Sequence, residues 1–323
     1  MKKTARLAIL CMAVLSFSGY AHNVTIPTDI NEMSLNKVAD NVYVVHGTRS
    51  MPNKDNKGFI SNSGFVVSDE GVVIIDTGGS LQIGEMLLKK INEVTDKPVI
   101  AVFNTHVHGD HWMGNAAIRK AYPEARIYAH ERAIERLQNG EAEQWLDIFM
   151  QSTDGAIEGT QIVLPDTALK GGETIEAAGN TFRIHHTGMA HTDNDIMIEY
   201  PERKTLFAGD IVIYGSTVSG ARPQDFSATG QISAVEFALE LPVDIYVPGH
   251  GPTGGREIPQ ATKRFLEILY QSVQRYYDEG LADFEMRDQV VEDLSEFSDW
   301  SGFDQIGRLI SYVYQQVEAA EFE

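Results

Sequence analysis

The chain has 323 residues, of which 43% are hydrophobic and 22% are charged. This composition is typical of a globular protein and argues against a disordered, collagenous or multi-span membrane protein. The 26 basic residues against 46 acidic ones give a net charge of −20, so the surface repels polyanions. We therefore expect no nucleic-acid partner, because binding one needs a basic surface stripe.

Residues 1–21 have the pattern of a secretory signal peptide. Three basic residues precede an apolar run from Leu7 to Phe17, and the small residues Gly19 and Ala21 suit cleavage before His22. The apolar run is too short for a permanent span, which needs about 20 residues. An uncleaved anchor is the alternative. We expect a periplasmic or secreted bacterial protein with no stable membrane span, carrying 23 basic and 46 acidic residues after cleavage.

Cleavage would also remove the only cysteine of the chain, Cys11. The mature protein would then have no disulfide, no thiolate metal ligand and no cysteine nucleophile. Its metal and acid–base chemistry must depend on histidine and carboxylate side chains.

After residue 22 the chain alternates between strand-like and helix-like runs. In the first half we predict strands at 42–46, 64–68, 72–76, 99–103 and 126–130, and helices at 81–94, 116–122 and 131–150. In the second half we predict strands at 174–177, 181–187, 195–200, 205–208 and 244–247, and helices at 232–239 and 259–277. Residues 281–323 indicate two further helices. The alternation favours stacked sheets with helices outside.

The densest group of candidate ligands follows a predicted strand. His106, His108, Asp110 and His111 fall within six residues and cannot all point into an apolar core. In an extended turn His106 and His108 share one side of the chain, and Gly109 turns the next two residues toward a neighbouring position. Imidazole and carboxylate suit zinc and, less selectively, iron or manganese. We interpret the segment as a metal-binding loop, with a solvated polar loop as the alternative.

Three further candidate ligands recur downstream, at His191, Asp210 and His250. Each follows a strand-like run and has a glycine nearby, as expected where backbone approaches a site closely. Taken singly, each is more often a turn residue than a ligand. Together with the first cluster they complete a pattern.

This pattern resembles the metallo-β-lactamase superfamily, whose HxHxDH motif stands here at residues 106–111. The resemblance spans roughly residues 40–275. It implies an α/β fold, a four-layer αββα sandwich with metals at one edge. It also implies one metal held by His106, His108 and His191, a second held by Asp110, His111 and His250, and Asp210 bridging both. The implied divisions are a signal peptide at 1–21, a metallo-β-lactamase-like domain at 22–280 and a C-terminal helical extension at 281–323.

Such a ligand set favours two Zn²⁺ ions, with iron or manganese as alternatives, because paired cations offset the repulsion between Asp110 and Asp210. Metals about 3.5–4 Å apart can share a water whose pKa falls from 15.7 to about 7, which supplies hydroxide near neutral pH. Asp110 would act as the catalytic residue that orients this hydroxide. We therefore predict a dinuclear zinc hydrolase that attacks a small-molecule amide, lactone or thioester carbonyl.

The position of Asp210 separates this chain from β-lactamases that have cysteine there. It resembles glyoxalase II, the lactonases and the periplasmic metallohydrolases associated with sulfur oxidation or quinoprotein relays, and residues 105–117 look most like the last group. Weak β-lactam hydrolysis is compatible with this site as a side activity.

One alternative is a mononuclear iron persulfide dioxygenase of the same fold, in which His111 and His250 are spare. Another is a non-catalytic metal-binding protein. The sequence specifies neither the substrate nor the oligomeric state.

Several residues outside the ligand set are also interpreted. Asp76 matches a position that braces the metal loop by hydrogen bonds. His46 is interpreted as structural. Candidates to line the mouth of the site are Trp112, Tyr214, Tyr276, Tyr277 and the polar loop 51–57, and Tyr214 is also a candidate oxyanion donor.

Overall fold

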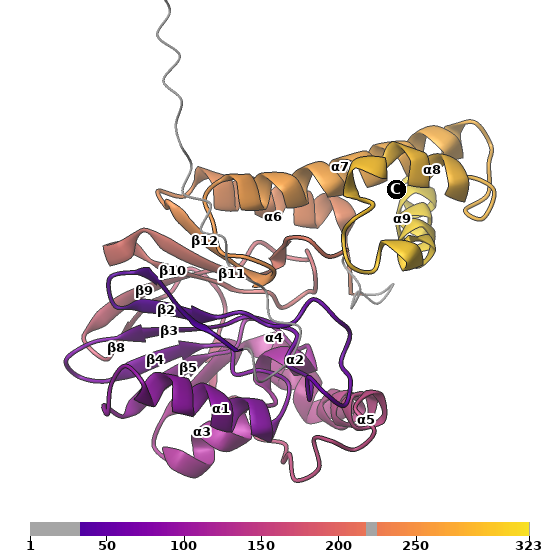
Figure 1. The fold of residues 1–323 in the computed structure, drawn as a ribbon. Coiled ribbons are helices and arrows are strands. Elements are labelled where there is room, and N and C mark those ends of the chain that lie inside the picture. The colour runs from indigo at the N-terminus through magenta and orange to yellow at the C-terminus, as the bar shows by residue number, and fades with distance from the viewer. Residues whose placement is uncertain (1–32, 218–224, 323) are drawn as a thin grey trace, which may run out of the picture.

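The computed structural model describes residues 33–217 and 225–322, so the predicted signal peptide at 1–21 lies outside the described residues. Within them, the N-terminal half supplies a seven-stranded sheet and the C-terminal half a five-stranded one (Figure 1). The strands of the first sheet, in spatial order, are β1 (Leu35–Ala39), β2 (Val42–Val45), β3 (Ser63–Val67), β4 (Val72–Ile75), β5 (Val99–Phe103), β6 (Arg126–His130) and β7 (Thr167–Leu169). Strands β1 to β4 pair antiparallel, and β4 to β7 pair parallel.

The second sheet has the order β12-β11-β10-β9-β8. Its strands are β8 (Thr174–Ala177), β9 (Asn180–His185), β10 (Met197–Tyr200), β11 (Thr205–Ile213) and β12 (Ile245–His250). Only the pair β11 and β12 is parallel among these neighbours. Their carboxyl ends therefore lie side by side, as do those of β4, β5 and β6 in the first sheet.

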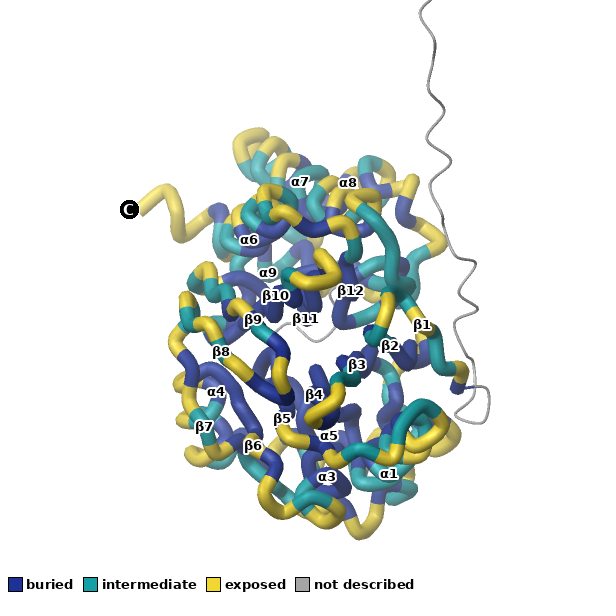
Figure 2. The backbone as a smooth tube through the Cα atoms, turned by 90° about the vertical axis from the view of Figure 1, so that its left-hand side faces the viewer, coloured by how far each residue is buried: buried dark blue, intermediate teal, exposed yellow. Residues whose placement is uncertain are grey.

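Helices cover the outer face of each sheet. Helices α1 (Leu81–Asn92) and α3 (Asn115–Ala121) pack on the first sheet, and α6 (Ala228–Glu240) and α7 (Glu257–Asp278) lie over the second. The Ser80 hydroxyl caps α1 by accepting a hydrogen bond from the backbone N–H of Ile83 at 3.3 Å. Figure 2 shows the two buried sheets between these helical layers. The predicted αββα sandwich is confirmed.

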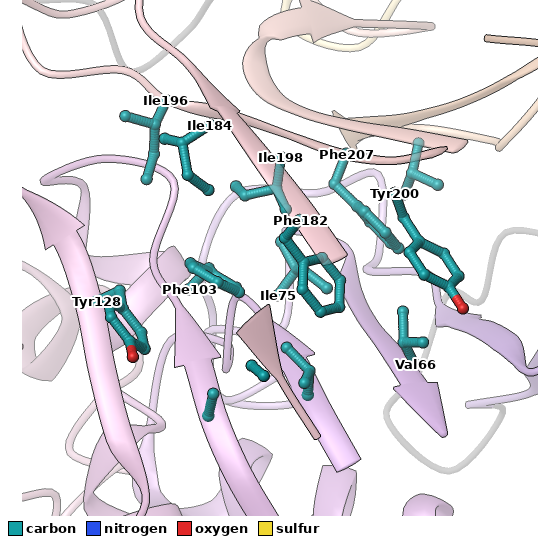
Figure 3. Close-up of a cluster of buried hydrophobic side chains, with 14 of the residues drawn as sticks. Val66, Ile75, Phe103, Tyr128, Phe182, Ile184, Ile196, Ile198, Tyr200 and Phe207 are labelled. Carbon is teal, nitrogen blue, oxygen red and sulfur yellow. The ribbon is translucent and has the colours of Figure 1, made fainter. Parts of the chain in front are cut away.

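The inner faces of the two sheets meet in an apolar core, drawn in Figure 3. Val66 and Phe103 of the first sheet face Phe182, Ile198 and Phe207 of the second, and all five are almost fully buried. Burial of one such side chain contributes about 1.5–3 kcal/mol. This core fixes the two sheets against each other and so fixes the distance between the strand ends that carry the candidate ligands.

The remaining helices are short or lie outside these two helical layers. They are α2 (Gly109–Trp112), α4 (Glu131–Arg136), α5 (Ala142–Ser152), α8 (Arg287–Asp293) and α9 (Ile306–Ala320), with single helical turns at Leu137–Glu141, Pro201–Arg203, Ser295–Phe297 and Phe303–Gln305. Helices α8 and α9 pack against α7 in one apolar cluster, so the C-terminal extension lies on the core of the molecule. None of the described helices is long and apolar enough to cross a membrane.

Two predicted elements differ from the observed ones. The helix predicted at 131–150 is broken into α4 and α5 at Gly140, whose φ of 99° no regular helix accommodates. Strand β11 runs to Ile213, beyond the predicted end at 208, because an apolar run resumes after Asp210. The short strands β1 and β7 were not predicted.

Candidate metal centre

All seven predicted ligands lie at one edge of the sandwich, in two adjoining groups. His106 and His108 follow β5, Asp110 and His111 lie in α2, His191 precedes β10, Asp210 lies within β11 and His250 ends β12. One group contains His106, His108, His191 and Asp210, and the other contains Asp110, His111 and His250. Within each group the donor atoms lie within 4.8 Å of one another. This division is the one implied by the resemblance.

Asp210 lies between the two groups. Its Oδ2 atom is 3.4 Å from His191 Nε2 in one group and 3.3 Å from His250 Nε2 in the other. Its Oδ1 atom is 3.3 Å from His111 Nε2. Asp110 Oδ2 is likewise 3.3 Å from both His111 Nε2 and His250 Nε2. A carboxylate in the position of Asp210 can serve both groups at once.

The inward-facing atoms have the character of metal ligands. His106 Nε2, His111 Nε2, Asp110 Oδ2 and Asp210 Oδ1 are buried and have no hydrogen-bond partner among the described residues. Such atoms are rare in folded proteins because each costs about 1–3 kcal/mol. His108 Nδ1 and His191 Nε2 are 3.1 Å apart. Two nitrogens bound to one tetrahedral zinc ion at about 2.0–2.1 Å would lie about 3.3–3.4 Å apart. The residues therefore fit divalent metal ions.

Asp76 orients one imidazole in each group, as predicted. His111 Nδ1–H donates to Asp76 Oδ2 at 2.8 Å. The same oxygen accepts the Thr105 hydroxyl proton at 2.8 Å, so the Thr105 oxygen is left to accept from His106 Nδ1–H at 3.1 Å. With protons on both Nδ1 atoms, the Nε2 atoms of His106 and His111 present their lone pairs to the centre of the site.

The polar segment before β3 positions His250. Its ring Nδ1–H donates to the Ile60 carbonyl at 2.8 Å, which leaves Nε2 free to bind a metal. The Asn62 side-chain amide donates to the carbonyls of Pro248 and Gly251, both at 2.8 Å, and so holds the backbone on either side of His250. These contacts were not predicted. The only signal for them is a run of polar residues, 61–63, before an apolar strand.

Two glycines let the backbone bring Asp210 into the site. Gly209 has φ +50° and lies at a break in the register between β11 and β12, a bulge that redirects the next side chain. At Gly249 an added Cβ would lie 1.9 Å from Asp210 Oδ1. Only glycine leaves room for the carboxylate at this position.

The carboxylates and imidazoles of the site shift one another's pKa values. Burial lowers the pKa of His106 and of His108 well below the ordinary value, so both are neutral donors. Burial also disfavours a charged His250, but Asp210 and Asp110 outweigh it and raise the pKa of His250 to about 10. Burial raises the pKa of the Asp110 carboxyl, but His111 outweighs it and holds that pKa well below its usual range. Both carboxylates thus stay ionised, with their negative charge balanced by protons on His111 and His250, whose place divalent cations would take when bound.

Two adjoining cavities open beside the donors. The inner cavity, of about 110 Å³, is lined by His108, Asp110, Asp210 and His250 together with Trp145, Ile148 and Phe149. The outer cavity, of about 220 Å³, shares Met51, Ile60, Ser216 and His250 with the inner one. Met51 of the predicted polar loop and Tyr214 do line this cleft.

The other predicted mouth residues do not line these cavities. Trp112 is fully buried, and its indole N–H donates to the Val107 carbonyl at 2.9 Å. Tyr276 and Tyr277 pack with the C-terminal helices. The aromatic side chain beside the donors is Trp145, whose ring centroid is 4.8 Å from that of His108. The sequence did not single out Trp145, because its spacing of four residues from Phe149 is equally typical of an ordinary buried helix face.

Curated relatives cover different shares of the chain. A linear primary-alkylsulfatase from a Pseudomonas species is 23% identical over 70% of this chain and 49% of its own length. A hydroxyacylglutathione hydrolase from a Synechococcus species is 30% identical over 41% of this chain and 42% of its own. A human acyl-coenzyme A thioesterase is 28% identical over 61% of this chain and 75% of its own. The chain thus spans about half or less of the length of the first two.

Solved structures share the fold. A metallo-β-lactamase from Pontibacter korlensis, 21% identical, matches with a TM-score of 0.57 over 73% of this chain and 99% of its own. A sec-alkylsulfatase from a Pseudomonas species, 18% identical, matches with a TM-score of 0.67 over 88% of this chain and 50% of its own. The family model of the metallo-beta-lactamase superfamily matches residues 56–250, more than half of the chain and all seven candidate ligands. The chain belongs to the metallo-β-lactamase superfamily.

Proposed function

We propose that this protein is a secreted or periplasmic dinuclear zinc hydrolase that acts on an amide, lactone or thioester carbonyl of a small molecule. One observation carries the proposal. Asp210 lies between two complete donor groups, within 3.4 Å of an imidazole nitrogen in each. The relatives that act on thioesters support the carbonyl chemistry. The proposed location rests on the pattern of residues 1–21 alone.

Bound metal ions would polarise the carbonyl and lower the pKa of bound water to about 7. The chain supplies the positioning. Asp110 lines the inner cavity and can accept a hydrogen bond from the attacking water, which fixes the orientation of that water. Trp145, Ile148 and Phe149 form an apolar wall that excludes competing water and receives an apolar part of the substrate.

The proposed ligand set uses every donor that the sequence singled out. A mononuclear iron dioxygenase of the same fold would give His111 and His250 no role. Both have one ring nitrogen fixed by a hydrogen bond to an oxygen acceptor and the other directed at the carboxylates. This arrangement favours the dinuclear site.

Sulfate-ester hydrolysis is a second candidate. The alkylsulfatase relative aligns over 70% of the chain, and the fold match to the sec-alkylsulfatase covers 88% of it, against 73% for the metallo-β-lactamase structure. The same two donor groups could bind a sulfate oxygen in place of a carbonyl oxygen.

The test is a substrate panel with the zinc-loaded protein: a 4-nitrophenyl ester, a δ-lactone, an acyl thioester, a cephalosporin and an alkyl sulfate. We expect zinc-dependent turnover of at least one carbonyl compound. Asp210→Asn should reduce this turnover about 10³-fold, because a ligand that serves both groups is worth several kcal/mol. Asp244→Asn, at a surface ion pair with Lys204, is the matched control and should change nothing.

Turnover of the alkyl sulfate alone would replace the proposal with the second candidate. Absence of zinc-dependent turnover on the whole panel would contradict both.

A further inference from the structure

Three loops build the wall of the outer cavity. They are residues 48–51 after β2, residues 214–216 at the end of β11, and residues 301–305 of the C-terminal extension. Backbone hydrogen bonds join them: Ser301 N–H donates to the Gly215 carbonyl at 3.0 Å, and Thr217 N–H donates to the Ser301 carbonyl at 2.9 Å. The Ser301 hydroxyl also donates to the Arg49 carbonyl at 2.7 Å. The C-terminal extension is therefore part of the cleft.

Arg49 presents a cation to this cavity. Its guanidinium lies against the backbone of Gly215, where an added Cβ would be 3.4 Å from Arg49 Cζ and 3.5 Å from Nη2. Within residues 33–217 and 225–322, no carboxylate forms an ion pair with Arg49. The Arg49 side chain is exposed and lines the same cavity as His250.

The two cavities differ in their lining on either side of His250. The inner cavity has an apolar wall of Trp145, Ile148 and Phe149, whereas Arg49 and several hydroxyl groups line the outer one together with Met51 and Ile60. Asp304 also lines the outer cavity, so a bound anion must lie toward Arg49 and away from this carboxylate. A molecule that spans both cavities would place its middle beside the metal-facing edge of His250.

We propose that Arg49 forms an anion subsite, which binds a carboxylate, sulfonate or sulfate group remote from the bond that is hydrolysed, while an apolar part of the same substrate fills the inner cavity. The proposal rests on the proposed function and names its substrate class, an amphipathic anion. Guanidinium groups suit this role because they bind oxyanions in a bidentate geometry. Because the chain has a net charge of −20, a local positive subsite would favour binding of such a substrate.

The first experiment measures binding without turnover. The probe is 1-hexanesulfonate, which has an apolar tail and cannot be hydrolysed, titrated calorimetrically into the zinc-loaded protein. We expect Arg49→Ala to weaken its binding about tenfold. Lys54→Ala removes the same charge from the same loop outside both cavities, and it should change the affinity less than twofold.

The second experiment measures selectivity. We compare mono-4-nitrophenyl glutarate, which carries a terminal carboxylate, with the neutral 4-nitrophenyl pentanoate. The ratio of kcat/KM for the two esters should fall about tenfold in Arg49→Ala, mainly through KM, and should be partly restored in Arg49→Lys. Asp304→Asn should move the ratio in the opposite direction, because it removes a charge that repels the anion.

Equal affinity of the wild type and Arg49→Ala for hexanesulfonate would overturn the subsite. So would the absence of binding by the wild type, or a loss of affinity in Lys54→Ala as large as that in Arg49→Ala. Failure of the wild type to hydrolyse either ester would count against the proposed function instead. The hexanesulfonate titration still decides the subsite in that case, because it needs no turnover.

Discussion

The donor cluster and the outer cavity differ in how the chain builds them. The donors come from strand ends and a short helix, and all but the partly exposed His250 are almost fully buried. Hydrogen bonds to Asp76, Thr105 and the Ile60 carbonyl fix three of the imidazole rings. The wall of the outer cavity comes from three loops, and Arg49 lies exposed on one of them. The chemistry of the site is thus carried by rigid elements, and the choice of substrate by loops that can change without disturbing them.

Apart from the loss of a ligand itself, the largest effect on the donor cluster is expected from Gly249→Ala. The new Cβ would overlap Asp210 Oδ1 at 1.9 Å, so the carboxylate must move. A displacement of about 1 Å at a catalytic centre costs about 10²-fold in rate, and we expect at least that loss of kcat/KM. Gly140→Ala is the control, because it introduces backbone strain at φ 99° with no atom within 4 Å of the new Cβ. Full activity of Gly249→Ala would show that Asp210 is not constrained as described.

A smaller effect is expected from Asp76→Asn. This change keeps the size of the side chain but removes the charge that holds the protons on His111 Nδ1 and, through Thr105, on His106 Nδ1. Residues in this role typically change metal affinity 10–100-fold. Chelator competition should measure a loss in that range, while Asp166→Asn, at the surface pair with Arg119, should retain the wild-type affinity. An unchanged metal affinity of Asp76→Asn would mean that Asp76 does not hold the imidazoles of His106 and His111 in their metal-binding orientation.

The smallest effect on the site is expected from a change at His46, the buried residue that follows β2 and precedes the loop of Arg49. It bonds Asn36 through Nδ1 and Thr253 through Nε2, and burial lowers its pKa to about 4. The unfolded chain takes up this proton near pH 6.5, so the folded state loses stability as pH falls from about 6.5 to about 4. His46→Gln should reduce the loss between pH 7 and pH 4.5 by about 2–3 kcal/mol in urea unfolding, with unchanged activity at pH 7. Parallel pH profiles for both proteins would rule out this contribution.

The sequence predicted the donor cluster far better than its surroundings, and the reason is physical. Ligand chemistry requires particular side chains at short spacings, so residues 106–111 are recognisable without coordinates, as is Asp76 after a buried strand. Strand alternation and helical spacing likewise predicted most elements of the sandwich. The cleft depends on contacts across the chain, such as Ser301 with Arg49, which leave no local pattern. Trp112 and Trp145 show the same limit, because nothing local distinguishes the buried indole from the one beside His108.

The measurement that tests the account most directly is the metal content per chain of the protein comprising residues 22–323, by elemental analysis, together with that of His250→Ala. The central claim is that Asp210 joins two donor groups, one of which needs His250. We predict close to two zinc ions per chain in the wild type and close to one in the variant. A single iron ion per chain, unaffected by His250→Ala, would contradict the claim.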